Sequence, residues 1–141
     1  SIQRSALVAF SAESMFNLVN DVTAYSEFLP GCAQSRIDEQ DATSMTASLL
    51  IAKAGVKQWF TTQNSLIENQ RIDMKLVDGP FSHLTGGWQF TPLSESACKI
   101  ELHLDFEFSS RLAQAAFGKL FKTLASSMVD AFTQRAKDIY R

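Results

Sequence analysis

The chain has 141 residues, of which 45% are apolar and 20% are charged, and this composition is typical of a globular protein with a hydrophobic core. The net charge of −2 gives no overall attraction to nucleic acid or to an anionic membrane. No apolar run approaches the roughly 18 residues that a membrane-spanning helix needs, so we expect a single domain over residues 1–141 in the cytoplasm.

The first thirty residues predict one strand and two short helices. The strand covers residues 2–10, and Ser11 has the type of side chain that caps a following helix over residues 12–20. A second short helix is expected over residues 22–28, because a Pro-Gly pair soon after it stops the helix. These two helices are too short to cover a large sheet.

From residue 32 to residue 108 the apolar residues recur with a period of two, which is typical of strands. The last strand is the clearest, since its alternating apolar residues predict one buried face in an antiparallel sheet. Gly86 and Gly87 predict a bend, or a close approach of another backbone, beside Trp88. The six predicted strands cover residues 32–40, 43–53, 56–67, 72–76, 84–90 and 98–108, and residues 91–96 are expected to form a loop.

The C-terminal residues 110–141 contain no proline and predict an amphipathic helix of about eight turns. Its apolar side carries Phe117, Phe121, Leu124, Met128, Phe132 and Ile139. Because only this helix is long enough to cover the predicted sheet, we expect an α+β fold. In this fold a curved antiparallel sheet of about seven strands wraps around the long C-terminal helix.

Three motifs stand out along the chain. They are Val22-x-x-Tyr25-x-x-Phe28-Leu29-Pro30-x-Cys32, then Asp78-Gly79-Pro80-Phe81-x-x-Leu84-x-Gly86-x-Trp88-x-Phe90, and finally Phe132-x-x-Arg135-Ala136. Together with the order of elements, they resemble the coenzyme-Q-binding protein and ribosome-association toxin family of the START-like (polyketide cyclase/dehydrase) superfamily. The resemblance covers essentially the whole chain and implies the helix-grip fold of that superfamily.

The resemblance implies two alternative functions. The first is binding of a hydrophobic small molecule, ubiquinone or another polyisoprenoid lipid, in a tunnel between the sheet and the C-terminal helix. The protein would then be a carrier or chaperone that supports respiratory electron transport, with transient contact at the inner membrane. The alternative is a toxin that binds the large ribosomal subunit and blocks subunit joining. Neither function implies an obligatory cofactor beyond a bound ubiquinone or prenyl lipid, and neither implies DNA as a partner.

Most of the residues expected to bind the ligand face the gap between the sheet and the C-terminal helix. They are Phe28, Leu29, Leu49, Phe60, Met74, Leu76, Phe81, Leu84, Trp88, Leu102, Leu104, Phe117, Phe121, Leu124, Met128 and Arg135. Ligand pockets are typically apolar with a few polar anchors, and Gln58, Thr62 and Asn64 are the inward polar candidates. The alternative is a core in which the same residues pack against one another.

Several of these residues have two interpretations. Phe81 either plugs one end of the sheet or lies at the tunnel mouth. Phe28 and Leu29 either pack as ordinary core residues or form a lid over the other end. Arg135 falls within the apolar side of the helix, where a guanidinium needs a partner. It therefore makes an ion pair or a carbonyl contact, or it anchors a quinone head group or a phosphate.

Basic residues lie outside the apolar stripe of the C-terminal helix. An RNA-binding surface would use such side chains on phosphates, and the alternative is an ordinary solvated helix face. They are Arg111, Lys119, Lys122, Lys137 and Arg141.

No pattern for catalysis or metal binding stands out. His83 and His103 are isolated from each other and from any nucleophile or metal-ligand cluster, so we expect a protein that is not an enzyme. Cys32 and Cys98 are far apart in the sequence and form no CxxC motif, so we expect two free thiols.

Overall fold

Seven strands form one antiparallel sheet in the order β1-β7-β6-β5-β4-β3-β2. A computed structural model describes residues 1–141 and places the first strand beside the last, so that Ile2 pairs with Leu104. The elements in chain order are β1 (Ile2–Val8), α1 (Ala12–Asn20), the 3₁₀ helix η1 (Val22–Glu27), β2 (Cys32–Gln40), β3 (Ser44–Lys53), β4 (Val56–Ile67), β5 (Arg71–Asp78), β6 (Phe81–Ser94), β7 (Ala97–Phe108) and α2 (Arg111–Tyr140).

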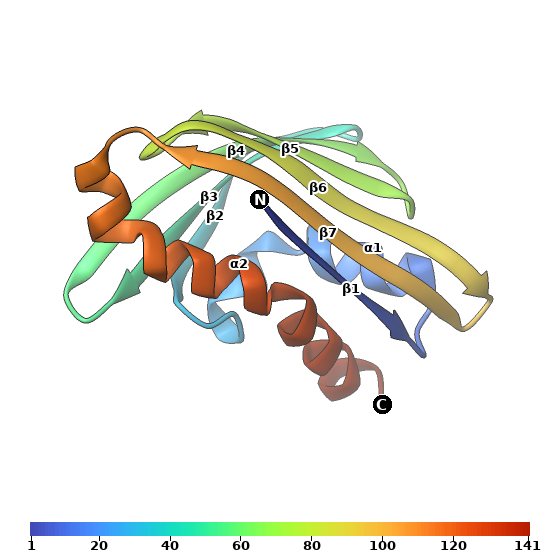
Figure 1. Cartoon of the computed structure of the whole chain (residues 1–141). Helices are drawn as coiled ribbons and strands as arrows, with labels where there is room; N and C mark the ends of the chain where they lie inside the picture. Colours follow the sequence, from blue (N-terminus) through green and yellow to red (C-terminus); the bar gives the residue numbers. More distant parts are fainter.

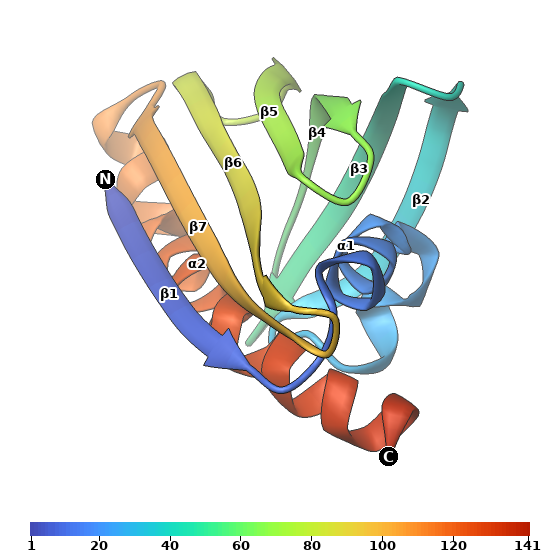
Figure 2. The same ribbon diagram turned by 90° about the vertical axis from the view of Figure 1, so that its right-hand side faces the viewer.

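The sheet curves over α2, which lies along its concave side (Figure 1). Figure 2 shows the same arrangement from the end, with α1 and η1 beside the strands on the side away from β1. The residues of α2 that are buried against the other elements are Gly118, Phe121, Leu124, Ala125, Met128, Val129, Phe132 and Ala136. This arrangement confirms the predicted α+β helix-grip fold.

Serine side chains begin both α-helices. Ser11 Oγ accepts a hydrogen bond from the backbone nitrogen of Ser14 at 3.0 Å, as the sequence predicts for α1. Ser110 Oγ accepts one from the backbone nitrogen of Ala113, also at 3.0 Å, at the start of α2. Each bond satisfies one of the amide groups that a helix leaves free in its first turn. The cap at Ser110 allows α2 to begin only a few residues after β7 ends at Phe108.

The structure corrects three predictions of local structure. β6 runs from Phe81 to Ser94, so most of the predicted loop 91–96 is strand. The strand continues past Pro92 because the pairing with β7 shifts register between Pro92 and Ser94, where a missing amide hydrogen is tolerated. β1 ends at Val8 and not at residue 10. Ile139 is 48% exposed, because the last turns of α2 extend beyond the sheet (Figure 1).

Gly86 and Gly87 of β6 are required by close backbone contacts. A Cβ atom on Gly86 would lie 2.0 Å from the carbonyl oxygen of His103, and one on Gly87 would lie 2.1 Å from that of Ile72. The neighbouring strands β7 and β5 can therefore approach β6 only because both positions lack side chains. This close approach directly precedes Trp88, which is 2% exposed and points into the space between sheet and helix.

Candidate functional site

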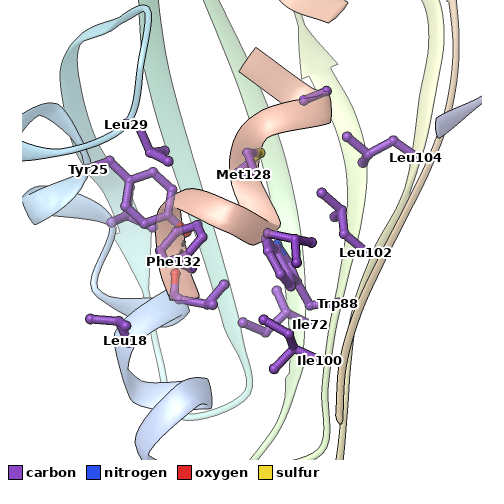
Figure 3. Packing of buried hydrophobic residues seen from close by; sticks show 14 of the residues in the cluster. Leu18, Tyr25, Leu29, Ile72, Trp88, Ile100, Leu102, Leu104, Met128 and Phe132 are labelled. Carbon is purple, nitrogen blue, oxygen red and sulfur yellow. Dashed lines mark hydrogen bonds between the residues drawn. The ribbon is translucent and has the colours of Figure 1, made fainter. Parts of the chain in front are cut away.

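A small apolar cavity lies between the concave side of the sheet and α2. Its volume is about 60 Å³. Figure 3 shows part of its wall, with Met128 on α2 facing the sheet that carries Trp88 and Leu104. The lining residues are Val22, Tyr25, Ala47, Leu49, Phe60, Thr62, Asn64, Met74, Leu84, Trp88, Leu104, Phe121, Leu124, Ala125 and Met128.

The predicted ligand residues fall into two groups. Those that line the cavity are Leu49, Phe60, Met74, Leu84, Trp88, Leu104, Phe121, Leu124 and Met128. Those that lie outside its wall are Phe28, Leu29, Leu76, Phe81, Leu102, Phe117 and Arg135. The first group comes from five strands, β3 to β7, and from α2, so the fold brings together residues that are distant in sequence.

Four lining residues are absent from the predicted set. Val22 and Tyr25 come from η1, which packs against β2 at one edge of the sheet. Ala47 and Ala125 come from β3 and α2, and both are buried. Small side chains at inward positions are the signal that could have found these two, because they leave space that larger neighbours do not fill.

Two polar side chains of β4 face the cavity. Thr62 is 8% exposed and Asn64 is 6% exposed. The hydroxyl of Thr62 donates a hydrogen bond to Asn64 Oδ1 at 2.9 Å. Gln58, the third inward candidate, does not line the cavity, since its amide donates to the carbonyl of Trp59 at 2.6 Å.

Tyr25 closes the cavity on the side of η1. Its hydroxyl donates a hydrogen bond to the carbonyl oxygen of Val19, and its ring packs edge-on against Phe132 with centroids 5.3 Å apart. Burial raises the pKa of the Tyr25 hydroxyl far above its ordinary value. The side chain therefore stays neutral and acts as a wall with no free donor.

A phenylalanine cluster fills the other end of the gap. Phe81 lies 4.8 Å from Phe121, 5.1 Å from Phe108 and 6.1 Å from Phe60, measured between ring centroids. Phe106 also contacts Phe121 at 4.9 Å. Phe81 is only 6% exposed, so of its two interpretations the structure favours the plug over the tunnel mouth.

The predicted tunnel is therefore not open in this structure. Small-molecule sites usually have volumes of about 300–1,000 Å³, whereas this cavity has about 60 Å³. The phenylalanine cluster occupies one end, and Tyr25 and Phe132 occupy the other. A polyisoprenoid chain would fit only after these side chains move apart.

Arg135 lies outside the cavity and contacts η1. Its Nη2 atom is 3.2 Å from Glu27 Oε1, and its guanidinium carbon is 4.9 Å from the centre of the Phe28 ring. The side chain is 21% exposed, and its buried Nε atom has no hydrogen-bond partner. The structure thus favours the ion pair over the carbonyl contact, and the guanidinium covers Phe28.

The remaining titratable groups that the sequence singles out are away from the cavity. His83 lies 3.5 Å from Asp105 through Nε2, and both side chains are about half exposed. Cys32 and Cys98 are free and buried. Burial raises the pKa of the Cys32 thiol to about 11 and also raises that of Cys98, so both stay protonated near neutral pH. No helix of the structure has the length and apolar character to cross a membrane.

A polar groove runs between the N-terminal half of α2 and strands β1 and β7. Arg4 and Lys122 line it together with Gln114 and Ser126, and Glu107 is its acidic residue. An adjoining depression on α2 adds Lys119. We call this surface the basic groove, because its cations outnumber its single carboxylate although the whole chain is slightly acidic.

The chain matches a family model described as polyketide cyclase / dehydrase and lipid transport over residues 8–133. It is 58% identical to the ribosome association toxin RatA of Escherichia coli (strain K12), an alignment that covers 99% of this chain and 88% of the relative. It is also 25% identical to the mitochondrial coenzyme Q-binding protein COQ10 of Drosophila melanogaster, over 95% of this chain and 57% of that protein.

Among solved structures the chain is similar to the Zhui aromatase/cyclase from Streptomyces sp. R1128. The TM-score is 0.86 at 17% sequence identity, and the match covers 99% of this chain and 94% of that chain. At this identity the likeness shows the shared fold alone.

Proposed function

Since this chain belongs to the polyketide cyclase / dehydrase and lipid transport family, we propose for it the function that its similar bacterial relatives carry in their names, association with the ribosome. The observation that supports this proposal is the 58% identity to the E. coli ribosome association toxin RatA over 99% of this chain. More specifically, we propose that the chain binds the large ribosomal subunit and blocks its joining with the small subunit.

The basic groove is the surface we assign to this function. Ribosomal RNA presents phosphates, which bind lysine and arginine side chains with an affinity that falls as salt rises. Lys119 and Lys122 are exposed on α2, and Arg4 adds a third cation from β1. Since the net charge is −2, binding to RNA requires such a local group of cations.

Co-sedimentation of the purified chain with separated ribosomal subunits tests the proposal. We expect the chain to pellet with the large subunit, and the bound fraction to fall as salt rises. The variant K119E/K122E is expected to lose about tenfold or more in affinity, because two phosphate contacts become repulsive. The matched control K53E/K57E makes the same charge change on the exposed β3–β4 hairpin.

The outcomes separate the function from the surface. If the unmodified chain stays in the supernatant with both subunits at low salt, association with the ribosome is wrong. If it pellets and both charge-reversal variants pellet equally well, the function stands but the basic groove is not the contact surface.

A second candidate function is binding of a small apolar ligand in the cavity. It is supported by the cavity itself, since an unfilled apolar space costs packing energy that a ligand can recover. Ubiquinone or another prenyl lipid is the finer form of this proposal, and the chain would then act as a carrier and not as an enzyme. This form requires the cavity to widen, as the phenylalanine cluster and Tyr25 close its ends.

Native mass spectrometry of freshly purified protein tests this second candidate. A bound ligand adds mass, and organic extraction then identifies it. Leu49 is a partly exposed lining residue, so L49R places a charge at the cavity edge and is expected to abolish ligand retention. The control L7R changes a residue that is 72% exposed on β1. Retention of the same mass by L49R would contradict binding in this cavity.

A further inference from the structure

We propose that Asn64 is the polar anchor of a ligand site in the cavity, and that the ligand is an uncharged apolar molecule with a hydrogen-bond acceptor oxygen, such as a ketone. This inference rests on the second candidate function, the binding of an apolar ligand. It adds the chemical class of the ligand and the atom that recognises it, Asn64 Nδ2.

Asn64 lies on β4, an interior strand of the sheet, and on the concave side. It pairs with Met45 of β3 and with Met74 of β5, so both neighbours across the strands are apolar. The residue is only 6% exposed, and its side chain lines the cavity. A polar residue at this depth needs hydrogen-bond partners.

One half of the Asn64 amide is satisfied within the protein and the other half is not. Thr62 donates its hydroxyl hydrogen to Asn64 Oδ1 at 2.9 Å, which fixes the orientation of the amide. Asn64 Nδ2 makes no hydrogen bond to any protein atom, and it is not among the side-chain atoms fully covered by protein. The nitrogen therefore presents free donor hydrogens to the cavity.

The rest of the lining determines what this donor can recognise. The only other hydroxyl in the wall besides Thr62 belongs to Tyr25, and it is already engaged with the carbonyl of Val19. No lining residue carries a charge. An anion would therefore lose its hydration without gaining a cation, whereas a neutral carbonyl would gain the Asn64 donor and the apolar contacts together.

The size of the cavity limits the ligand as the structure stands. About 60 Å³ is less than the roughly 150 Å³ that accommodates benzene in a protein interior. Met74 and Met128 lie in the wall, and methionine side chains adapt readily to a guest. A five-membered ring is smaller than benzene, so we choose probes of that size and expect Met74 and Met128 to shift to admit them.

Two isosteric probes test the donor. Cyclopentanone carries a carbonyl oxygen, and methylenecyclopentane has the same shape with a CH₂ group in place of that oxygen. Each is titrated into the full chain, and the methyl signals of Met74 and Met128 and the side-chain amide signals of Asn64 are followed by NMR. We expect both probes to shift the methionine methyl signals, and only cyclopentanone to shift the Asn64 amide strongly.

A pair of variants supplies the quantitative test. T62V/N64L removes both polar groups and is expected to weaken cyclopentanone binding about five- to tenfold, the effect of one net hydrogen bond, while methylenecyclopentane binds as before. The matched control T62V keeps the Asn64 donor and is expected to keep most of the affinity for cyclopentanone. Unchanged binding of methylenecyclopentane also shows that the double variant is folded.

Three negative results have different meanings. If both probes bind and T62V/N64L binds cyclopentanone as well as the unmodified chain does, the role of Asn64 is wrong and the cavity remains a ligand site. If neither probe shifts the methionine signals of the unmodified chain, ligand binding in the cavity fails, and the inference fails with it. If both probes shift the methionine methyl signals but neither changes the side-chain amide signals of Asn64, the partner of Asn64 Nδ2 is water and not a ligand.

Discussion

The two halves of the gap between sheet and helix are packed in different ways. At one end Phe121 contacts four other phenylalanines, with Phe81 and Phe106 nearest at 4.8 and 4.9 Å. One turn further along α2, Ala125 faces the cavity, and Ala47 faces it from β3. The same helix face therefore forms a dry core where its residues are large and a hollow where they are small.

This difference suggests that the two ends of the apolar surface have different roles: the phenylalanine cluster stabilises the fold, and the cavity is suited to binding. The phenylalanine cluster has no polar member, whereas the cavity holds Thr62 and Asn64. A core gains from complete packing, and a binding site gains from an incomplete one with a polar anchor. Substitutions at the two ends should accordingly have opposite effects on stability.

The largest effect is expected from F121A in the phenylalanine cluster. Removing this ring, which is 2% exposed, should lower the free energy of unfolding by about 3–5 kcal/mol. Urea denaturation measures the change, and F117A at a partly exposed position of the same helix is the control. A loss below about 1 kcal/mol would mean that the cluster is not a rigid core.

A smaller effect of opposite sign is expected from T62V/N64L without ligand. Replacing both partners of a buried hydrogen bond by apolar groups removes a donor that has no partner. The free energy of unfolding should rise by about 1 kcal/mol, seen as a higher midpoint in urea. A fall in stability would show that the polar pair supports the fold and is not kept for binding.

Filling the hollow should also stabilise the protein. A47V adds two methyl groups to a buried strand residue that faces the cavity, and we expect a gain of about 0.5–1 kcal/mol. The same variant should lose binding of cyclopentanone, because the probe and the new side chain need the same space. Thermal denaturation and the NMR titration check the two effects, and retained binding would place the ligand elsewhere.

The smallest effect is expected on the outer side of the sheet. The hydroxyl of Ser48 donates to Asp38 Oδ2 at 2.5 Å, and Arg36 adds an ion pair at 2.8 Å, and these contacts lower the pKa of the Asp38 carboxyl. D38N should therefore lower the free energy of unfolding by less than about 1 kcal/mol at pH 7.

The sign of the pH dependence follows from this lowered pKa. The stabilisation by Asp38 is complete above the pKa of the unfolded chain and is lost as pH falls through the pKa of the folded state. The difference in stability between D38N and the unmodified chain should therefore vanish in acid, below the folded-state pKa of Asp38. Melting temperatures of both proteins from neutral to acidic pH measure this difference, with D130N on the exposed face of α2 as control. A difference that persists at the lowest pH would point to packing and not to charge.

Most of the fold was predictable because one face of the sheet is buried and the other is not. The alternation from Ile100 to Phe108 locates β7, and the apolar stripe locates α2. The end of β6 was not predictable, because proline and serine usually mark a loop. Only the pairing across to Cys98 and Ala97, with its register shift, keeps Pro92 and Ser94 in the strand.

The site was less predictable, because periodicity shows which residues face inward but not how completely their side chains fill the gap between the sheet and α2. The wall of the cavity is defined as much by Ala47 and Ala125 as by the large residues around them. Tyr25 enters the wall through the packing of η1, which the sequence does not specify. Likewise, Arg135 and Glu27 are 108 positions apart, and only the fold makes them a pair.

The pairing of β1 with β7 also affects how the chain must fold. Ile2 and Leu104 are neighbours across the two strands although they are 102 positions apart in a chain of 141 residues, so this pairing has a long sequence separation. Proteins with such contacts fold slowly, because long loops must close before the contacts form. The concave apolar face also has no cover until α2 has been synthesised, so the nascent chain is expected to need protection from aggregation while its last thirty residues emerge.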